Sequence, residues 1–303
     1  MSMFDKIAII GLGLIGSSIA HAARRGKLAK EIAGHDASAD VLERAGVVGF
    51  CDTLHADIGD AVEGGELVIL CTPVGAYRTI AEQIQQHLEE GAILSDVGSV
   101  KGAVIRDVTP SVPLDVHFIP AHPIAGTEFS GPEAGFATLF DGRWTILTPV
   151  PNSDPAAVEK LKSFWQGLGS QVDVMDASHH DLVLAITSHL PHLIAYNIVG
   201  TARDLEEVTE GEVIKYSASG FRDFTRIASS DPTMWRDVFL NNRAAVLEVL
   251  SRFNDDLRVL QKAVEDGDGQ VLFDTFTRGR AIRRAIIEIG QDTSAPNFGR
   301  NKS

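Results

Sequence analysis

The sequence predicts an α/β fold with a doubly wound parallel sheet, followed by an all-α C-terminal region. Short apolar runs alternate with helical patterns through the first 176 residues, which is typical of βαβ units. A glycine-rich turn joins the first apolar run to the first helical pattern. Beyond residue 176 the strand-like runs disappear and long helical patterns follow. We therefore expect one domain over 1–176, a second over 177–292, and a flexible tail over 293–303.

The individual elements follow from the same alternation. The predicted strands are the short aliphatic runs Lys6–Ile10, Glu31–His35, Leu67–Cys71, Ala92–Ser95, Val116–Ile119, Trp144–Leu147 and Gln171–Met175. The predicted helices of the first domain are Leu14–Arg25, Ala76–Leu88, Val100–Val108 and one that begins at Pro155 behind the N-cap Asp154. The predicted helices of the second domain are Ser178–Leu205, Pro232–Ala263 and Val271–Ile289.

Composition excludes several classes of protein. The 303 residues carry 27 Lys and Arg against 41 Asp and Glu, a net charge of −14, and 44% of them are hydrophobic. This is a globular composition, and the acidic balance argues against nucleic acid as the main partner. Two cysteines, Cys51 and Cys71, cannot build a disulfide scaffold. No apolar run reaches the 18–20 residues or so of a membrane span, and no signal peptide is evident, so we expect a cytoplasmic protein without a membrane partner.

The turn after the first predicted strand has the GxGxxG pattern of dinucleotide-binding sites. Gly11 permits a tight turn, Gly13 lets the backbone approach a pyrophosphate, and Gly16 lets the helix pack closely on the strand. Leu14 and Ile15 lie between these glycines, at the helix N-terminus, where free N–H groups can bind phosphate. The pattern follows a strand and opens a helix, so it predicts a Rossmann-type domain.

An acidic residue supports this prediction and indicates which dinucleotide binds. Asp36 lies 20 residues after Gly16, at the end of the second predicted strand. A carboxylate there accepts both ribose hydroxyls and repels a 2′-phosphate, and no Arg follows within 37–41. We therefore expect NAD rather than NADP. The alternative is that Asp36 only caps the next helix.

Three further strand ends contribute candidate site residues. Thr72 and Pro73 follow the third strand and could border the cofactor, whereas the neighbouring Cys71 is expected to be buried filler. Ser99 follows the fourth strand and could hydrogen-bond a substrate hydroxyl or the nicotinamide, or cap the next helix. His122 lies between turn residues just past the fifth strand, where its pKa near neutrality suits a general base.

The second domain offers histidines and arginines. His189 and His192 share one helix face, and Pro191 between them is expected to kink the helix; a metal site is not indicated, and both could equally be core histidines. Residues 215–243 hold five Lys and Arg against three acids, a local +2, whereas 203–212 holds five acids and one Arg, a local −4. This local charge indicates an anionic substrate, with surface ion pairs as the alternative.

Six motifs in this order resemble the prephenate/arogenate (cyclohexadienyl) dehydrogenases of tyrosine biosynthesis. The resemblance covers nearly the whole chain, and the last four motifs together are specific. The motifs are GLGLIG at 11–16, CTPV at 71–74, DVGSVKG at 96–102, HPIAGTE at 122–128, SHLPH at 188–192 and GFRDFTRIASSDPTMW at 220–235.

The resemblance implies NAD-dependent oxidative decarboxylation of a small cyclohexadienol and a homodimer formed through the helical domain. By resemblance, His122 is the catalytic histidine at the ring hydroxyl, and Ser99 hydrogen-bonds the same hydroxyl. Arg226 matches a substrate-carboxylate ligand and His192 a pocket histidine. The remaining implied substrate contacts are Trp235 as a wall, Arg222 as a cation where some relatives have Lys, and Glu128, which could pair with the amine of arogenate or form a gating ion pair.

The sequence leaves two other functions open. A β-hydroxyacid dehydrogenase also combines a Rossmann domain with a helical one, but relies on a helical-domain Lys, and Ser178–Leu205 contains none. A catalytically silent NAD-binding regulator would bind cofactor without turnover, and the presence of Ser99, His122 and Arg226 argues against it.

Overall fold

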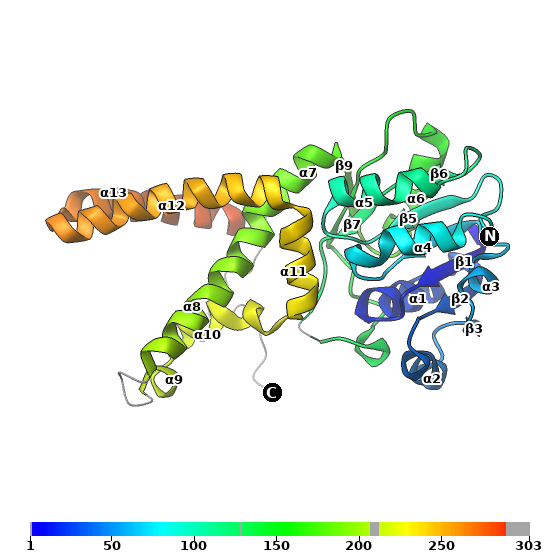
Figure 1. The fold of residues 1–303 in the computed structure, drawn as a ribbon, viewed down its shortest axis with the longest axis horizontal. Helices are drawn as coiled ribbons and strands as arrows, with labels where there is room; N and C mark the ends of the chain where they lie inside the picture. The colour runs from blue at the N-terminus through cyan, green and yellow to red at the C-terminus, as the bar shows by residue number, and fades with distance from the viewer. Residues whose placement is uncertain (1, 128, 207–211, 289–303) are drawn as a thin grey trace. The chain divides into compact units, whose positions relative to one another are not determined.

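The computed structural model describes residues 2–127, 129–206 and 212–288 (Figure 1). The chain forms two compact units, Met1–Val246 and Leu247–Ser303, and each is described by itself. The first unit contains both sheets and all of the predicted site residues that the structure describes. The described part of the second unit is a helical hairpin.

A six-stranded sheet with the order β3-β2-β1-β4-β5-β6 forms the centre of the first unit, and all its pairs are parallel. This is the order of a doubly wound nucleotide-binding sheet, so the predicted fold class is confirmed. The strands are β1 (Phe4–Ile10), β2 (Ala29–His35), β3 (Thr53–His55), β4 (Leu67–Leu70), β5 (Ile93–Asp96) and β6 (His117–Phe118). The helices between and after them are α1 (Leu14–Gly26), α2 (Ala39–Val48), α3 (Ile58–Val62), α4 (Tyr77–Ile84) and α5 (Lys101–Val108).

Both faces of this sheet are buried. Alternate β1 residues serve opposite faces: Ile7 and Ile9 pack with α1, whereas Ala8 and Ile10 pack with α3, α4 and α5. Because side chains alternate across a strand, a strand covered on both sides must be apolar at every position. This explains why β4 reads as an uninterrupted Leu-Val-Ile-Leu run, with all four residues buried.

The last two predicted strands do not join the parallel sheet. A second sheet has the order β7-β8-β9, built from β7 (Ala121–Pro123), β8 (Trp144–Leu147) and β9 (Gln171–Val174). β7 and β8 are antiparallel, whereas β8 and β9 are parallel and connected by α6 (Pro155–Gly167). Residues 119 and 120 carry the chain from β6 directly into this second sheet, which the sequence did not predict.

One long helical segment opens the second half of the chain. It consists of α7 (Ala177–Leu184), a π-helical turn over Ala185–His189, and α8 (Leu190–Glu206). Pro191 has no N–H and its ring crowds the carbonyl four residues earlier, so the wider π turn just before it accommodates the proline. By length and composition alone, Ala177–Asp204 could cross a membrane. Its Asp181, however, hydrogen-bonds to α5 within the same unit.

The predicted helix over 232–263 is broken at Asn242. Two shorter helices, α9 (Glu212–Lys215) and α10 (Ser219–Thr225), lead to α11 (Pro232–Asn241). α12 (Arg243–Asp266) then follows. Asn242 leaves the helical conformation, with ψ at 31°, and its side chain is buried. The sequence pattern does not show this break, because the helical periodicity continues on both sides of Asn242 and a single Asn is tolerated within a helix.

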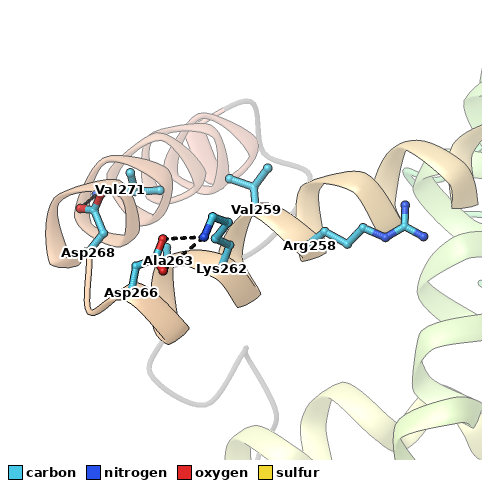
Figure 2. A pocket seen from close by; sticks show the side chains of 7 residues that line it. All are labelled: Arg258, Val259, Lys262, Ala263, Asp266, Asp268 and Val271. Carbon is cyan, nitrogen blue, oxygen red and sulfur yellow. Dashed lines mark hydrogen bonds and ion pairs between the residues drawn. The ribbon is translucent and has the colours of Figure 1, made fainter.

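In the second unit, α12 turns into α13 (Gly269–Glu288). Figure 2 shows a pocket at this turn, lined by Arg258, Val259, Lys262, Ala263, Asp266, Asp268 and Val271. Lys262 pairs with Asp266, and Asp268 accepts the N–H groups that open α13. None of the described residues that line this pocket is a predicted site residue.

A buried ion pair connects the two sheets of the first unit. The Lys101 ammonium lies 2.6 Å from the Asp96 carboxylate, and both side chains are completely inaccessible to solvent. Lys101 also donates to the carbonyl of Ala121 on β7, and the other Asp96 oxygen accepts the Ala121 N–H. Burial raises the pKa of Asp96 and lowers that of Lys101, while each partner's charge acts in the opposite direction. The pair thereby joins the end of β5 to the start of β7.

We expect Lys101→Met to destabilise the first unit by about 3–5 kcal/mol, because it leaves the Asp96 carboxylate buried without its counter-ion. Urea unfolding followed by circular dichroism measures this. The matched control is Arg78→Ala, which removes a partly exposed ion pair with Asp107 and should cost at most about 1 kcal/mol. Equal losses in the two variants would contradict a special role for the buried pair.

Candidate active site

The glycine turn between β1 and α1 has the geometry that its sequence predicts. Gly11 has a φ of +101°, and a Cβ there would lie 2.8 Å from the backbone of Cys71. A Cβ on Gly16 would lie 2.0 Å from the Gly11 carbonyl oxygen. Above Gly13 there is nothing within 4 Å. Side chains are therefore excluded from the two packed positions, and space is left over the third.

The N-terminus of α1 offers donors to an anion. Gly13 is the N-cap, so no side chain caps the helix, and the first turn holds no acidic residue. The N–H groups of Leu14 and Ile15 belong to this uncapped turn, where the helix dipole favours negative charge. Open space over Gly13 together with uncapped N–H groups fits the pyrophosphate of a dinucleotide.

Asp36 supports the glycine turn. One carboxylate oxygen accepts the N–H of Leu12 at 3.0 Å and the other accepts the N–H of Ser38 at 2.9 Å. The alternative role as cap of the next helix is wrong, because the N-cap of α2 is Ser38, whose hydroxyl accepts from Val41. Asp36 thus lies at the end of β2 beside the glycine turn, where the sequence predicts the ribose contact.

Thr72 and Pro73 lie at the end of β4, facing the same turn. The Thr72 methyl would be 2.9 Å from a Cβ on Gly11, so its side chain packs against the glycine turn. Its hydroxyl is buried and has no hydrogen-bond partner among the described residues. Pro73 caps a short 3₁₀ turn. The adjacent Cys71 has its pKa raised by burial, which agrees with a filler role.

His122 is on a strand rather than in a loop. It occupies the middle of β7, opposite Ile146 of β8, because the second sheet begins directly after β6. The residue is buried, at 9% exposure. Nδ1 of His122 lies 2.8 Å from Nε2 of His180 on α7, and Nε2 of His122 makes no hydrogen bond to any residue that the structure describes. One nitrogen is therefore anchored and the other is available.

A carboxylate on α7 caps the helix that follows Ser99. Asp181 accepts the backbone N–H groups of Lys101 and Gly102, at 2.7 and 2.8 Å. The expectation that Ser99 could cap this helix is wrong, because the N-cap is Val100 and it makes no side-chain bond. Ser99 remains half-buried in the loop after β5. Its hydroxyl makes no hydrogen bond to the described part of the chain, so it is available to a ligand.

Burial keeps the histidines of the site neutral. Burial, followed by the neighbouring charges of His180, Lys101 and His189, holds the pKa of His122 well below its ordinary value. The pKa of His180 is also lowered, mainly by burial. A histidine that is neutral at physiological pH has a free lone pair and can accept a proton.

His189 is a buried histidine with one satisfied nitrogen. Its Nδ1 lies 3.1 Å from the amide nitrogen of Asn242, which also donates to the carbonyl of Asp181. Nε2 of His189 is buried and has no partner among the described residues. Burial lowers the pKa of His189 to about 4. The π turn ends at His189 and the helix break lies at Asn242, so both partners of this hydrogen bond lie at irregular positions of the helices.

Three of the predicted substrate residues lie together. The rings of His192 and Trp235 stack with centroids 3.6 Å apart, and the Trp235 indole N–H is buried without a partner among the described residues. His192 Nδ1 hydrogen-bonds the carbonyl of Ser188. Burial lowers the pKa of His192, the bond to Ser188 raises it in part, and the nearby charge of Arg226 lowers it again. Aromatic walls beside a guanidinium can hold a flat, negatively charged molecule.

The other two predicted substrate residues are less informative. Arg222 lies on α10 and is exposed. Glu128 lies outside the described residues. Among the residues that the structure describes, no group of three or more His, Cys, Asp or Glu is arranged to hold a metal ion.

Sequence reasoning missed the residues behind the predicted ones. Asp96, Lys101, His180, Asp181 and Asn242 form the hydrogen bonds that position His122 and His189. The available signals were the acid and base of DVGSVKG and the His-His-Asp run at 179–181.

Comparison with known protein families agrees with the geometry. The prephenate dehydrogenase nucleotide-binding domain matches residues 19–174, and the prephenate dehydrogenase dimerization domain matches residues 176–278. The chain belongs to the prephenate dehydrogenase family. A cyclohexadienyl dehydrogenase from Zymomonas mobilis is 41% identical over 286 residues, which cover 94% of this chain and 97% of the relative.

Solved structures of the family have the same fold. A prephenate dehydrogenase from A. aeolicus, crystallised with hydroxyphenyl propionate and NAD+, superposes with a TM-score of 0.86 at 33% identity, covering 93% of this chain and 98% of that one. An arogenate dehydrogenase from Synechocystis gives a TM-score of 0.78 at 26% identity, covering 92% and 99%. The A. aeolicus structure contains NAD+, the cofactor that Asp36 and the glycine turn predict for this chain.

The lowered histidine pKa values predict loss of stability in acid. Between pH 6.5 and 4 the unfolded chain binds protons that the folded His189 does not, so the free energy of unfolding falls as the pH falls through this window. For His189 the loss is about 3 kcal/mol. Urea unfolding at several pH values measures it. His189→Gln should flatten the dependence, whereas the exposed His179→Gln should leave it as in wild type; equal slopes in all three proteins would contradict the assignment.

Proposed function

We propose that the enzyme catalyses the NAD-dependent oxidative decarboxylation of prephenate to 4-hydroxyphenylpyruvate, of arogenate to tyrosine, or of both, in tyrosine biosynthesis. The observation that carries the proposal is His122. It is neutral, one ring nitrogen is hydrogen-bonded to His180, and the other is available to a substrate. The same chain carries the glycine turn of a dinucleotide site at the end of β1. Membership of the prephenate dehydrogenase family supplies the substrate class.

The cofactor is assigned to the glycine turn. In this proposal Gly11, Gly13, Leu14, Ile15 and Gly16 hold the pyrophosphate, Asp36 holds the adenosine ribose, and Thr72 with Pro73 borders the cofactor at the end of β4. Bound NAD+ supplies the hydride acceptor for the ring carbon that bears the hydroxyl. The chain itself then needs one base and correct positioning, because aromatisation of the ring drives loss of the carboxylate as carbon dioxide.

His122 is the base in this mechanism. Its Nε2 accepts the proton of the ring hydroxyl, so that the oxygen–hydrogen bond breaks as the carbonyl begins to form. Ser99 hydrogen-bonds the same hydroxyl and orients it. Arg226 binds a substrate carboxylate, Arg222 adds positive charge, and His192 and Trp235 form the wall of the ring pocket. Glu128 is assigned to the substrate side chain.

The organisation of the enzyme is part of the proposal. We assign 1–176 to NAD binding, 177–292 to substrate binding and dimerisation, and 293–303 to a flexible tail; the junction of the two family matches near 175 supports this division. We assign the enzyme to the cytoplasm. Recovery of the protein in the membrane pellet after cell fractionation would contradict that assignment.

Activity is tested by following NADH at 340 nm or so with prephenate and arogenate in parallel. We expect turnover with at least one of them. His122→Asn should lower kcat about 100-fold or more while NAD+ still binds, because the proton acceptor is lost.

Arg226→Ala should raise KM for the substrate about 10-fold or more and leave KM for NAD+ nearly unchanged.

Three outcomes would contradict these assignments. Absence of NADH formation with either substrate would reject the proposed function. Near-normal turnover by His122→Asn, or an equal rise of both KM values in Arg226→Ala, would reject the corresponding residue role.

We propose that the helical region forms a homodimer. Large apolar side chains are exposed on it, including Ile198 and Val199 on α8 and Phe273 and Phe276 on α13. A second copy would remove such surfaces from water. Light scattering should give twice the mass of one chain. Phe273→Glu should shift it toward one chain, whereas Leu114→Glu, also at an exposed apolar residue but in the nucleotide-binding region, should not. A monomeric wild type would contradict the proposal.

A further inference from the structure

A chain of hydrogen bonds runs from His122 away from the site. Nδ1 of His122 lies 2.8 Å from Nε2 of His180, and Nδ1 of His180 lies 2.9 Å from an Asp181 carboxylate oxygen. The two rings are 5.1 Å apart and inclined by 66°. His180 is completely buried. Three side chains from β7 and α7 thus form a line that ends at a carboxylate.

The partners of Asp181 fix the direction of every bond in this line. Its oxygens accept the backbone N–H groups of Lys101 and Gly102, which can only donate. The carboxylate is therefore an acceptor, and Nδ1 of His180 must donate to it. A neutral imidazole carries one N–H, so Nε2 of His180 accepts and Nδ1 of His122 donates. The same argument leaves Nε2 of His122 without a proton.

The surroundings favour two neutral rings. The charged and titratable groups that act on them are Lys101, Asp96, Asp181 and His189. The charge of Lys101 opposes protonation of both rings. Asp181 and Asp96 favour protonation of His180, but burial has the larger effect and lowers its pKa. With both rings neutral, the arrangement of protons derived from the hydrogen bonds is the one that satisfies every partner.

We propose that His180 and Asp181 are positioning residues that hold His122 in the tautomer with a proton on Nδ1 and a lone pair on Nε2. The role depends on the proposed dehydrogenation, in which that lone pair takes the hydroxyl proton. The oxygen–hydrogen bond breaks and a nitrogen–hydrogen bond forms at Nε2, while Nδ1–H stays bonded to His180. The positive charge on His122 then lies one ring away from the Asp181 carboxylate, which stabilises it.

The first experiment compares three variants of α7. His180→Phe keeps a ring but removes the acceptor, so kcat should fall about 100-fold while KM for the substrate and Kd for NAD+ change less than about threefold. His180→Gln offers an amide oxygen near the position of Nε2 and should recover about 10-fold of the loss. His179→Phe, at the exposed neighbouring histidine, should match wild type.

Each other result overturns the proposal. An unchanged kcat in His180→Phe would show that the tautomer does not depend on His180. A KM or Kd that rises as much as kcat falls would show that His180 shapes the pocket. Failure of His180→Gln to recover any activity while remaining folded would show that the hydrogen-bond acceptor is not what matters.

The second experiment needs no turnover and so separates this proposal from the proposed function. Nitrogen-15 labelling of the ten histidines, with NAD+ bound to the wild-type protein, reports which ring nitrogen carries the proton. His122→Asn assigns the His122 signals. We expect Nδ1 of His122 protonated and Nε2 unprotonated, with the two forms mixing in His180→Phe. A protonated Nε2 in wild type overturns the proposal even if the enzyme is active, and remains decisive if His180→Phe does not fold.

Discussion

The Asp181 carboxylate is the contact on which the rest of the site depends. It belongs to α7, yet it caps α5 through the N–H groups of Lys101 and Gly102, and it hydrogen-bonds His180. A helix N-terminus favours a carboxylate because its N–H groups are unpaired and its dipole is positive there. One side chain therefore ties the helical segment to the loop after β5, and the orientation of His122 follows from that attachment.

The need to hydrogen-bond buried polar groups also explains the irregular parts of the helices. The π turn at 185–189 and the helix break at Asn242 each interrupt a favourable hydrogen-bonding pattern. In return, Asn242 bonds both the Asp181 carbonyl and His189. Buried polar groups cost free energy unless they are hydrogen-bonded, so a site built from buried histidines needs such fixed amide and carbonyl partners.

The sequence predicted what local rules determine and missed what distant contacts determine. Gly11, Gly16 and Asp36 were found because a tight turn, close packing and a strand end each restrict the residue type locally. Lys101 was missed because lysine is almost never fully buried, and only the tertiary structure supplies its partner. His180 was missed because its partner His122 is 58 residues away. The second sheet was missed because a short strand looks the same in either sheet.

Two opposing electrostatic demands explain why the cations and the neutral base of the site lie on different elements. An anionic substrate is attracted by positive charge, whereas a base must be uncharged, and a net charge of −14 serves neither demand by itself. The structure separates the two. Arg226 and Arg222 are exposed cations on the helical region, and an arginine keeps its charge at any physiological pH. His122 is buried on β7 beside Lys101, where burial and that positive charge keep it neutral. The buried Lys101 ammonium disfavours a positive charge on His122. It thus preserves the lone pair that the proposed chemistry uses.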